Sequence, residues 1–293
     1  MYIFCFRFLY IYWLCMILQL IKAIINSHIF ISLLSILMVY RTSRVFNINI
    51  QAHQYSLVFL CTIFVYCIHS IFTEEKVSTD RVRWNAKRKP LYFLLTGISG
   101  FFLSLLIYQY PINVLYLLPA GIPTFYYTLS RIPQKYFTFK KVYFKTLNLT
   151  WVWVYVTAIF PVLISGRILF SGDTLSFFAL EFVYIYLICF YFDHRDLLDD
   201  PQHYIFFNPH LHVAGVLKFI SLMFFIAFIS AFSYGLANGY LSSKLLLFFI
   251  LLSFSKKSLT SKSEWLFYCY LDGMMAADLL GVLLFKSFYT TKL

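Results

Sequence analysis

The sequence has 293 residues, of which 61% are hydrophobic, 22% aromatic and only 12% charged. Soluble domains carry about 25% charged residues, so this chain has too few charges to cover a soluble domain of its length. The net charge of +12 lies mainly in short connections between apolar runs, which indicates membrane topology instead of nucleic-acid binding. The composition therefore predicts an all-α, polytopic membrane protein.

Apolar runs of about 20 residues, the length that a helix needs to cross a bilayer, recur along the chain. They predict helices near residues 25–47, 55–73, 91–109, 112–130, 146–165, 174–192, 213–232, 234–254 and 264–285. A kink or a break is predicted in the fourth, at Pro119 and Pro123. Residues 1–24 are apolar without a cleavage signal, so we interpret them as an extra or interfacial helix before one membrane domain, 25–293.

Lys and Arg residues alternate between the connections, and this alternation predicts the topology. The connections after the second, fourth and eighth spans are basic, whereas those after the first, third, fifth and seventh carry few or no basic residues. The positive-inside rule puts the basic set on the cytoplasmic side, of an inner membrane if the source is bacterial. The connection after the second span contains Arg81, Arg83, Lys87, Arg88 and Lys89. The connection after the fourth span contains Arg131, Lys135, Lys140, Lys141 and Lys145.

Four of the 12 acidic residues fall within eight positions at the end of the sixth span, on this same predicted side. Asp193, Asp196 and Asp200 follow i, i+3, i+7 spacing, which stacks carboxylates on one helical face. Such a stack suits Mg²⁺, a hard ion that takes oxygen ligands and shares them with substrate phosphates. The alternative is a solvated loop in which the Asp residues cap a following turn, with Arg195 as their partner.

The pattern Asp193-x-Arg195-Asp196-x-x-x-Asp200 resembles the second aspartate-rich motif, DxRDxxxD, of the UbiA superfamily of intramembrane prenyltransferases. Tyr270-Leu271-Asp272-Gly273 in the last span resembles a late element of the same family. The resemblance implies about nine transmembrane helices around a central cavity. It also implies that Mg²⁺ and an isoprenyl diphosphate bind at two acidic motifs on the cytoplasmic side.

The first motif of that family, NxxDxxxD, is degenerate in this chain. The stretch from Asp80 to Leu91 resembles the basic loop that follows this motif, but Thr73 and Lys76 then occupy its two earlier positions. Lys76 removes an oxygen ligand and would repel a cation, or would contact the diphosphate directly. The resemblance implies catalytic roles for Asp193 and Asp196, metal ligation by Asp80, Asp193, Asp196 and Asp200, and diphosphate binding by Lys76, Arg81, Arg88 and Arg195.

These observations predict an enzyme that transfers an isoprenyl group to an unidentified acceptor with Mg²⁺, with membrane lipid and isoprenyl diphosphate as partners and no nucleic acid. One alternative is a catalytically inactive relative that binds a lipid or a partner membrane protein. Another is a transporter, for which Glu181 and Asp278 are the only acidic residues that could lie deep in the membrane. Arg41 and Arg44 lie near the end of the first span, and we expect them to extend to the membrane interface.

Overall fold

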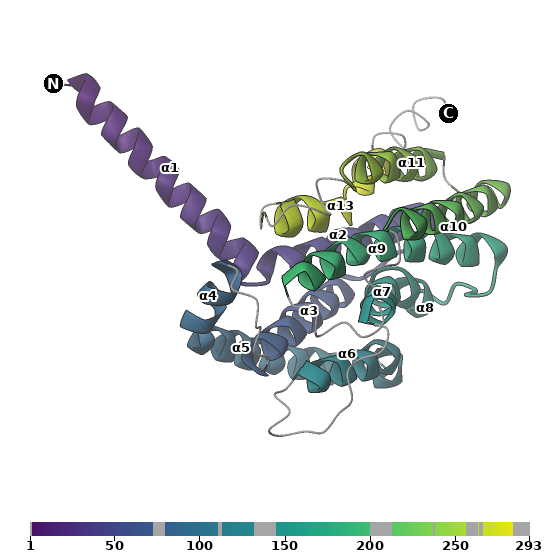
Figure 1. The fold of residues 1–293 in the computed structure, drawn as a ribbon. Coiled ribbons are helices and arrows are strands. Elements are labelled where there is room, and N and C mark those ends of the chain that lie inside the picture. Colours follow the sequence, from purple (N-terminus) through teal and green to yellow (C-terminus); the bar gives the residue numbers. More distant parts are fainter. Residues whose placement is uncertain are drawn as a thin grey trace.

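The structure is a computed structural model of the chain that describes residues 2–72, 80–110, 113–131, 145–199, 213–236, 238–255, 263 and 266–283. All regular elements within these ranges are helices (Figure 1). The prediction of an all-α protein is therefore confirmed for the part of the chain that is described.

The helices follow one another with short connections. The first half contains α1 (Tyr2–Asn26), α2 (Ile29–Phe46), α3 (Ala52–Phe72), α4 (Asp80–Lys87), α5 (Lys89–Gln109), the 3-10 turn η1 (Val114–Leu117) and α6 (Leu118–Arg131). The second half contains α7 (Lys145–Val154), the π-helical η2 (Tyr155–Ile159), α8 (Phe160–Ile164), α9 (Gly172–Asp199), α10 (Val213–Ser233), α11 (Asn238–Ser253), the π-helical η4 (Leu266–Leu271) and α13 (Asp272–Met274).

Seven helical segments of the described chain are long and apolar enough to cross a membrane. They are Ile29–Phe46, Ala52–Phe72, Lys89–Gln109, Thr146–Ile164, Gly172–Arg195, Ala214–Ser233 and Leu266–Leu283, which we call the last span. The other two predicted spans correspond to shorter helices, because α6 has 14 residues and α11 has 16. A multi-pass membrane protein is therefore confirmed, with seven spans of full length where nine were predicted.

Helix α6 continues through Pro123 although a proline nitrogen cannot donate a hydrogen bond. The carbonyl that would otherwise accept this bond belongs to Pro119, and it accepts one from the indole Nε1 of Trp151 on α7 at 2.8 Å. The carbonyl of Pro123 similarly accepts a bond from Nδ2 of Asn148 at 3.0 Å. The predicted irregularity is thus accommodated by the first turns of α7, which pack against α6.

Helix α9 forms the centre of the bundle, where its apolar residues from Phe177 to Tyr191 are mostly buried. It packs against α7 on one side and α10 on another. Helices α5 and α10 are the least buried of the spans and present large apolar side chains such as Phe101 and Phe232 outward. Such surfaces are stable against lipid tails, which solvate apolar side chains as a protein core does.

Helix α1 extends away from the bundle (Figure 1) and contacts α2 and α4 near its base. The extra N-terminal helix predicted at residues 1–24 thus corresponds to a helix that runs on to Asn26. His28 separates it from α2 with a left-handed φ of 66°, a conformation that is uncommon for residues other than glycine.

Several helices begin or end at the level where α9 reaches Asp193. The Nε2 atom of His28, just before α2, lies 2.8 Å from Oγ of Ser70 near the end of α3. Thr146, in the first turn of α7, donates a hydrogen bond to Asp193. We call this the motif end of the bundle, and it is the end that the charge pattern assigns to the cytoplasm.

The last span packs closely on α11 at Gly281. A Cβ atom there would lie 2.2 Å from Cβ and 2.5 Å from Oγ of Ser243. The Ser243 hydroxyl also donates to the carbonyl of Asp278 at 3.3 Å. Small residues at such a contact let two membrane helices approach each other.

We expect Gly281→Ala to lower the free energy of unfolding by about 1–3 kcal/mol, because the added methyl group overpacks this contact. The measurement is the unfolding midpoint of the purified protein in detergent. Gly97→Ala on α5 is the matched control, since nothing lies within 4 Å of a Cβ atom there. An unchanged midpoint for Gly281→Ala would contradict the close approach of α11 and the last span.

Candidate functional site

Asp193 lies at the motif end with its side chain only 5% exposed. Its Oδ2 atom accepts a hydrogen bond from the hydroxyl of Thr146, which ties the end of α9 to the start of α7. Helix α9 continues to Asp199, so the backbone has the helical form that the i, i+3 spacing of Asp193 and Asp196 assumes. A carboxylate in this position is shielded from bulk water but lies at the end of a span, not at its middle.

Arg195 is also buried, and it packs against aromatic rings instead of extending outward. Its guanidinium carbon lies 4.6 Å from the ring centre of Phe267, 5.1 Å from that of Tyr268 and 5.4 Å from that of Phe192. Such cation–π contacts hold η4 against the end of α9. Arg195 therefore fixes the beginning of the last span beside Asp193.

Of the other predicted site residues, the structure describes the side chain of Arg88. It is exposed at the start of α5, with its guanidinium carbon 4.3 Å from the ring centre of Trp84. Lys76 and Asp200 lie outside the described residues, as do the side chains of Asp80, Arg81 and Asp196. Among the residues that are described, no cluster of three His, Cys, Asp or Glu side chains suits a metal ion. The structure therefore places Asp193 against α7 and Arg195 against η4, and the predicted metal and diphosphate site stays a prediction.

A cavity of about 320 Å³ lies between α3, α6 and the span formed by α7, η2 and α8. Near the beginnings of α3 and α6 its wall is apolar and includes Leu57, Leu117 and Phe160. At the motif end its wall includes His69, Tyr127 and Asn148. Cavities of roughly 300–1,000 Å³ with a mostly apolar wall and a few polar groups are typical ligand sites.

The polar wall of this cavity is built from contacts between helix ends. The ring of His69 stacks on Tyr127 with centroids 5.2 Å apart. The buried His28 contacts Ser70 through Nε2, and its ring packs 5.3 Å from that of Tyr66. His28 has a left-handed backbone conformation at the junction of α1 and α2, and its imidazole contacts α3 at Ser70.

The cavity and the acidic motif are adjacent through α7. Leu149 lines the cavity, and Thr146, which binds Asp193, lies one helical turn before it. The polar end of the cavity thus lies at the same end of the bundle as Asp193. This adjacency was not predictable from the sequence, because it depends on how three helices that are distant in the chain pack together.

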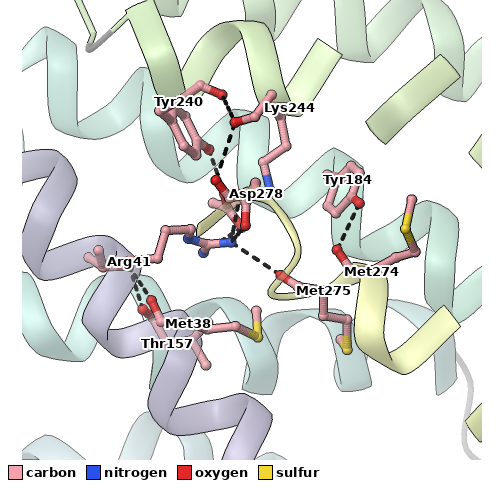
Figure 2. A network of polar contacts seen from close by, with 12 residues as sticks. Met38, Arg41, Thr157, Tyr184, Tyr240, Lys244, Met274, Met275 and Asp278 are labelled. Carbon is pink, nitrogen blue, oxygen red and sulfur yellow. Dashed lines mark hydrogen bonds and ion pairs between the residues drawn. The ribbon is translucent and has the colours of Figure 1, made fainter. Parts of the chain in front are cut away.

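A second polar region lies deeper in the bundle and consists of Arg41, Glu181, Lys244 and Asp278. Figure 2 shows three of them, Arg41, Lys244 and Asp278. Arg41 contacts Glu181 at 2.8 Å and Asp278 at 2.9 Å. Lys244 contacts the same two carboxylates at 2.9 Å and 2.6 Å. All four side chains are fully buried, and their formal charges sum to zero. We call these four residues the ion network.

The ion network also supports a break in the last span. Residues 275–277 form a turn between α13 and a final helical segment, 278–283. The carbonyl of Met275 accepts a bond from Nη1 of Arg41 at 3.3 Å, and that of Met274 accepts one from the Tyr184 hydroxyl at 2.9 Å (Figure 2). The turn keeps i to i−3 backbone hydrogen bonds, such as Met275 N–H to the Asp272 carbonyl, and the two side chains add partners for its carbonyls.

The structure corrects one expectation about these charges and confirms another. Arg41 does not extend to the interface, because Asp278 and Glu181 bind its guanidinium inside the bundle. Both carboxylates do lie deep, as predicted. Lys244 was not singled out, although a single lysine within the predicted span 234–254 was the signal that could have identified it.

We expect Lys244→Met to lower the free energy of unfolding by about 3–5 kcal/mol, because it leaves two buried carboxylates with one cation. The double variant Glu181→Gln, Lys244→Met keeps the Arg41–Asp278 pair and a neutral total, so it should be more stable than Lys244→Met alone. The measurement is the unfolding midpoint in detergent. Lys218→Met on an exposed position of α10 controls for the loss of a lysine. Additive losses in the double variant would show that the charges do not act together.

The chain was compared with known proteins. No family model, curated protein or solved structure matches it. Its function is therefore inferred from the cavity, the acidic motif and the ion network.

Proposed function

We propose that this protein is a UbiA-like prenyltransferase that transfers an isoprenyl group from an isoprenyl diphosphate to an acceptor at the motif end. The observation that carries the proposal is the adjacency of an elongated, mostly apolar cavity and a shielded carboxylate. Leu149 lines the cavity one turn from Thr146, which binds Asp193. An isoprenyl diphosphate has the matching polarity, with a long apolar tail and a strongly charged head.

The cavity suits the apolar part of this substrate. Its wall near the beginnings of α3 and α6 would bury the isoprenyl tail and exclude water from it. Tyr66 and Trp153, whose ring centres are 6.4 Å apart, also line the cavity. Aromatic faces stabilise a nearby positive charge, and in this proposal that charge is the allylic cation.

The motif end suits the charged part of the substrate. The Thr146 hydroxyl orients the Asp193 carboxylate, an oxygen donor of the kind that Mg²⁺ prefers. We propose that Asp193, Asp196 and Asp200 would hold Mg²⁺, which would neutralise charge on the diphosphate. Arg81, Arg88, Lys76 and Arg195 would add positive charge near the head of the substrate. Asp80 is the remaining acidic candidate from the degenerate first motif.

In the proposed reaction, the bond between the allylic carbon and the diphosphate oxygen breaks, and the electron pair leaves with the diphosphate. A nucleophilic atom of the acceptor then forms a bond to the allylic carbon and loses its proton. The contribution of the chain is to orient the diphosphate at Asp193 and to keep the cation in a water-excluded cavity. Both contributions act on the charge that develops as the first bond breaks.

One observation favours a transporter as a second candidate. The last span contains a tight turn at residues 275–277, beside the ion network, and irregular helices at mid-membrane form the binding sites of many transporters. In a transporter, variants of the ion network would change uptake into vesicles, whereas variants of Asp193 would not. In a prenyltransferase, variants of Asp193 would lower diphosphate release.

We expect the double variant Asp193→Asn, Asp196→Asn to lower the Mg²⁺-dependent release of diphosphate by about 100-fold, because the charged groups that bind the diphosphate are lost. The assay uses geranylgeranyl diphosphate and the purified protein in detergent with a panel of acceptors. Asp173→Asn is the matched control, because Asp173 lies at the opposite end of α9 and pairs with Arg167. If the folded wild type binds the lipid but shows no turnover with any acceptor, the enzyme proposal fails and a lipid-binding relative replaces it.

A further inference from the structure

The described wall of the cavity contains polar side chains but no acidic or basic ones apart from histidine. Its wall includes His, Ser, Thr, Tyr and Asn side chains, but none of the described residues that line it is Asp, Glu, Lys or Arg. An ion that entered would lose its hydration without gaining an opposite charge, at a large cost in free energy. A stable ligand that lies in the cavity is therefore uncharged, whereas the transient allylic cation of the proposed reaction would form at the motif end, beside the departing diphosphate.

The polar end of the cavity offers groups that both donate and accept hydrogen bonds. His28 and Ser70 lie within 2.8 Å of each other at its wall. His69, Tyr127 and Asn148 complete this end. Imidazole and hydroxyl groups can donate and accept, and the Asn148 amide adds an acceptor oxygen, since its Nδ2 donates to the Pro123 carbonyl. A hydroxyl is an uncharged group whose single oxygen both donates a hydrogen bond and accepts others, so it can bond with donors and acceptors of this wall.

The remaining wall sets the shape of the ligand. Leu57 and Ser70 both line the cavity and lie thirteen residues apart on α3, so the cavity follows this helix for about 20 Å. Away from the motif end the wall is formed by side chains such as Val58, Leu117 and Phe160. A ligand that fills it therefore has an elongated apolar body and a polar group at one end.

We propose that the cavity binds an uncharged amphiphile whose head is a hydroxyl group, held beside His69 and Asn148 at the motif end. Two kinds of molecule share this chemistry, a phenol with an alkyl chain and an aliphatic lipid alcohol, whereas a lipid carboxylate is excluded. Binding of this hydroxyl compound follows from the wall of the cavity alone and does not rest on the proposed prenyl transfer. In that reaction the compound would compete with the isoprenyl tail for the same cavity, so it is a ligand of the cavity and not the acceptor.

Four probes of similar length test the proposal on the wild-type protein in lipid nanodiscs, without Mg²⁺ or any diphosphate. They are 4-octylphenol, 1-dodecanol, 4-octylanisole and 4-octylbenzoate, and binding is followed by the change in tryptophan fluorescence, because Trp153 lines the cavity. We expect 4-octylphenol or 1-dodecanol to bind about fivefold more tightly than 4-octylanisole, which lacks the donor. The carboxylate should bind at least about 100-fold more weakly than the better hydroxyl probe. The tighter of the two hydroxyl probes identifies the kind of head group.

The variant His69→Phe removes the ring nitrogens of His69 and keeps an aromatic ring against Tyr127. It should reduce the preference for the hydroxyl over the methyl ether to about twofold or less and leave binding of 4-octylanisole unchanged. His53→Phe is the matched control, because His53 stacks on Tyr110 with centroids 4.0 Å apart and does not line the cavity. Unchanged binding of the methyl ether also shows that the cavity is intact.

Two results would overturn the proposal: equal binding of the carboxylate and the phenol, or an unchanged preference for the hydroxyl in His69→Phe. The probe panel on the wild type decides the first even if His69→Phe does not fold. Hydroxyl-selective binding without diphosphate release would overturn the prenyl transfer alone. Diphosphate release without hydroxyl selectivity would overturn the present inference alone.

Discussion

A charge inside a bilayer has no water to solvate it, and the four charges at the centre of this bundle therefore stabilise one another. Arg41 and Lys244 each contact both Glu181 and Asp278, so no formal charge in the network is left without an opposite partner. These residues come from α2, α9, α11 and the last span. Because any sliding of one helix would separate opposite charges in a low dielectric, the network sets the register of all four.

Helix α9 connects the ion network to the candidate site, because Glu181 and Asp193 both belong to it. Glu181 and Asp193 are twelve residues apart on this helix, which corresponds to about 18 Å along its axis. The ion network holds one level of α9, and Thr146 and the aromatic partners of Arg195 hold the other. The position of the acidic motif beside the cavity thus depends on contacts made deep in the bundle, far from the motif itself.

The sequence was sufficient where the physical cause is local and insufficient where it is long-range. The apolar run predicted at 55–73 became α3, Ala52–Phe72, because burial in lipid requires only length and composition. Arg41 was misinterpreted because its partner Asp278 is 237 residues away, and a single sequence carries no sign of such a pairing. The cavity was hidden for the same reason, since His69, Tyr127 and Asn148 come from three separate helices. The resemblance of Asp193-x-Arg195-Asp196 to a prenyltransferase motif predicts a role for Asp193 that stays a prediction, and it gave no indication of the cavity.

The two polar regions of the bundle have opposite designs, and this difference bears on where a ligand binds. In the ion network the opposite charges face one another, and the Tyr240 hydroxyl donates a further bond to Glu181. A ligand could enter there only by displacing one of these partners, which would leave a buried charge uncompensated. In the cavity the polar side chains surround open volume and carry no charge, so a ligand needs to displace nothing but solvent or lipid. Binding is therefore favoured in the cavity, whereas the ion network fixes α2 and α9, which pack against α3 and α7 of the cavity wall.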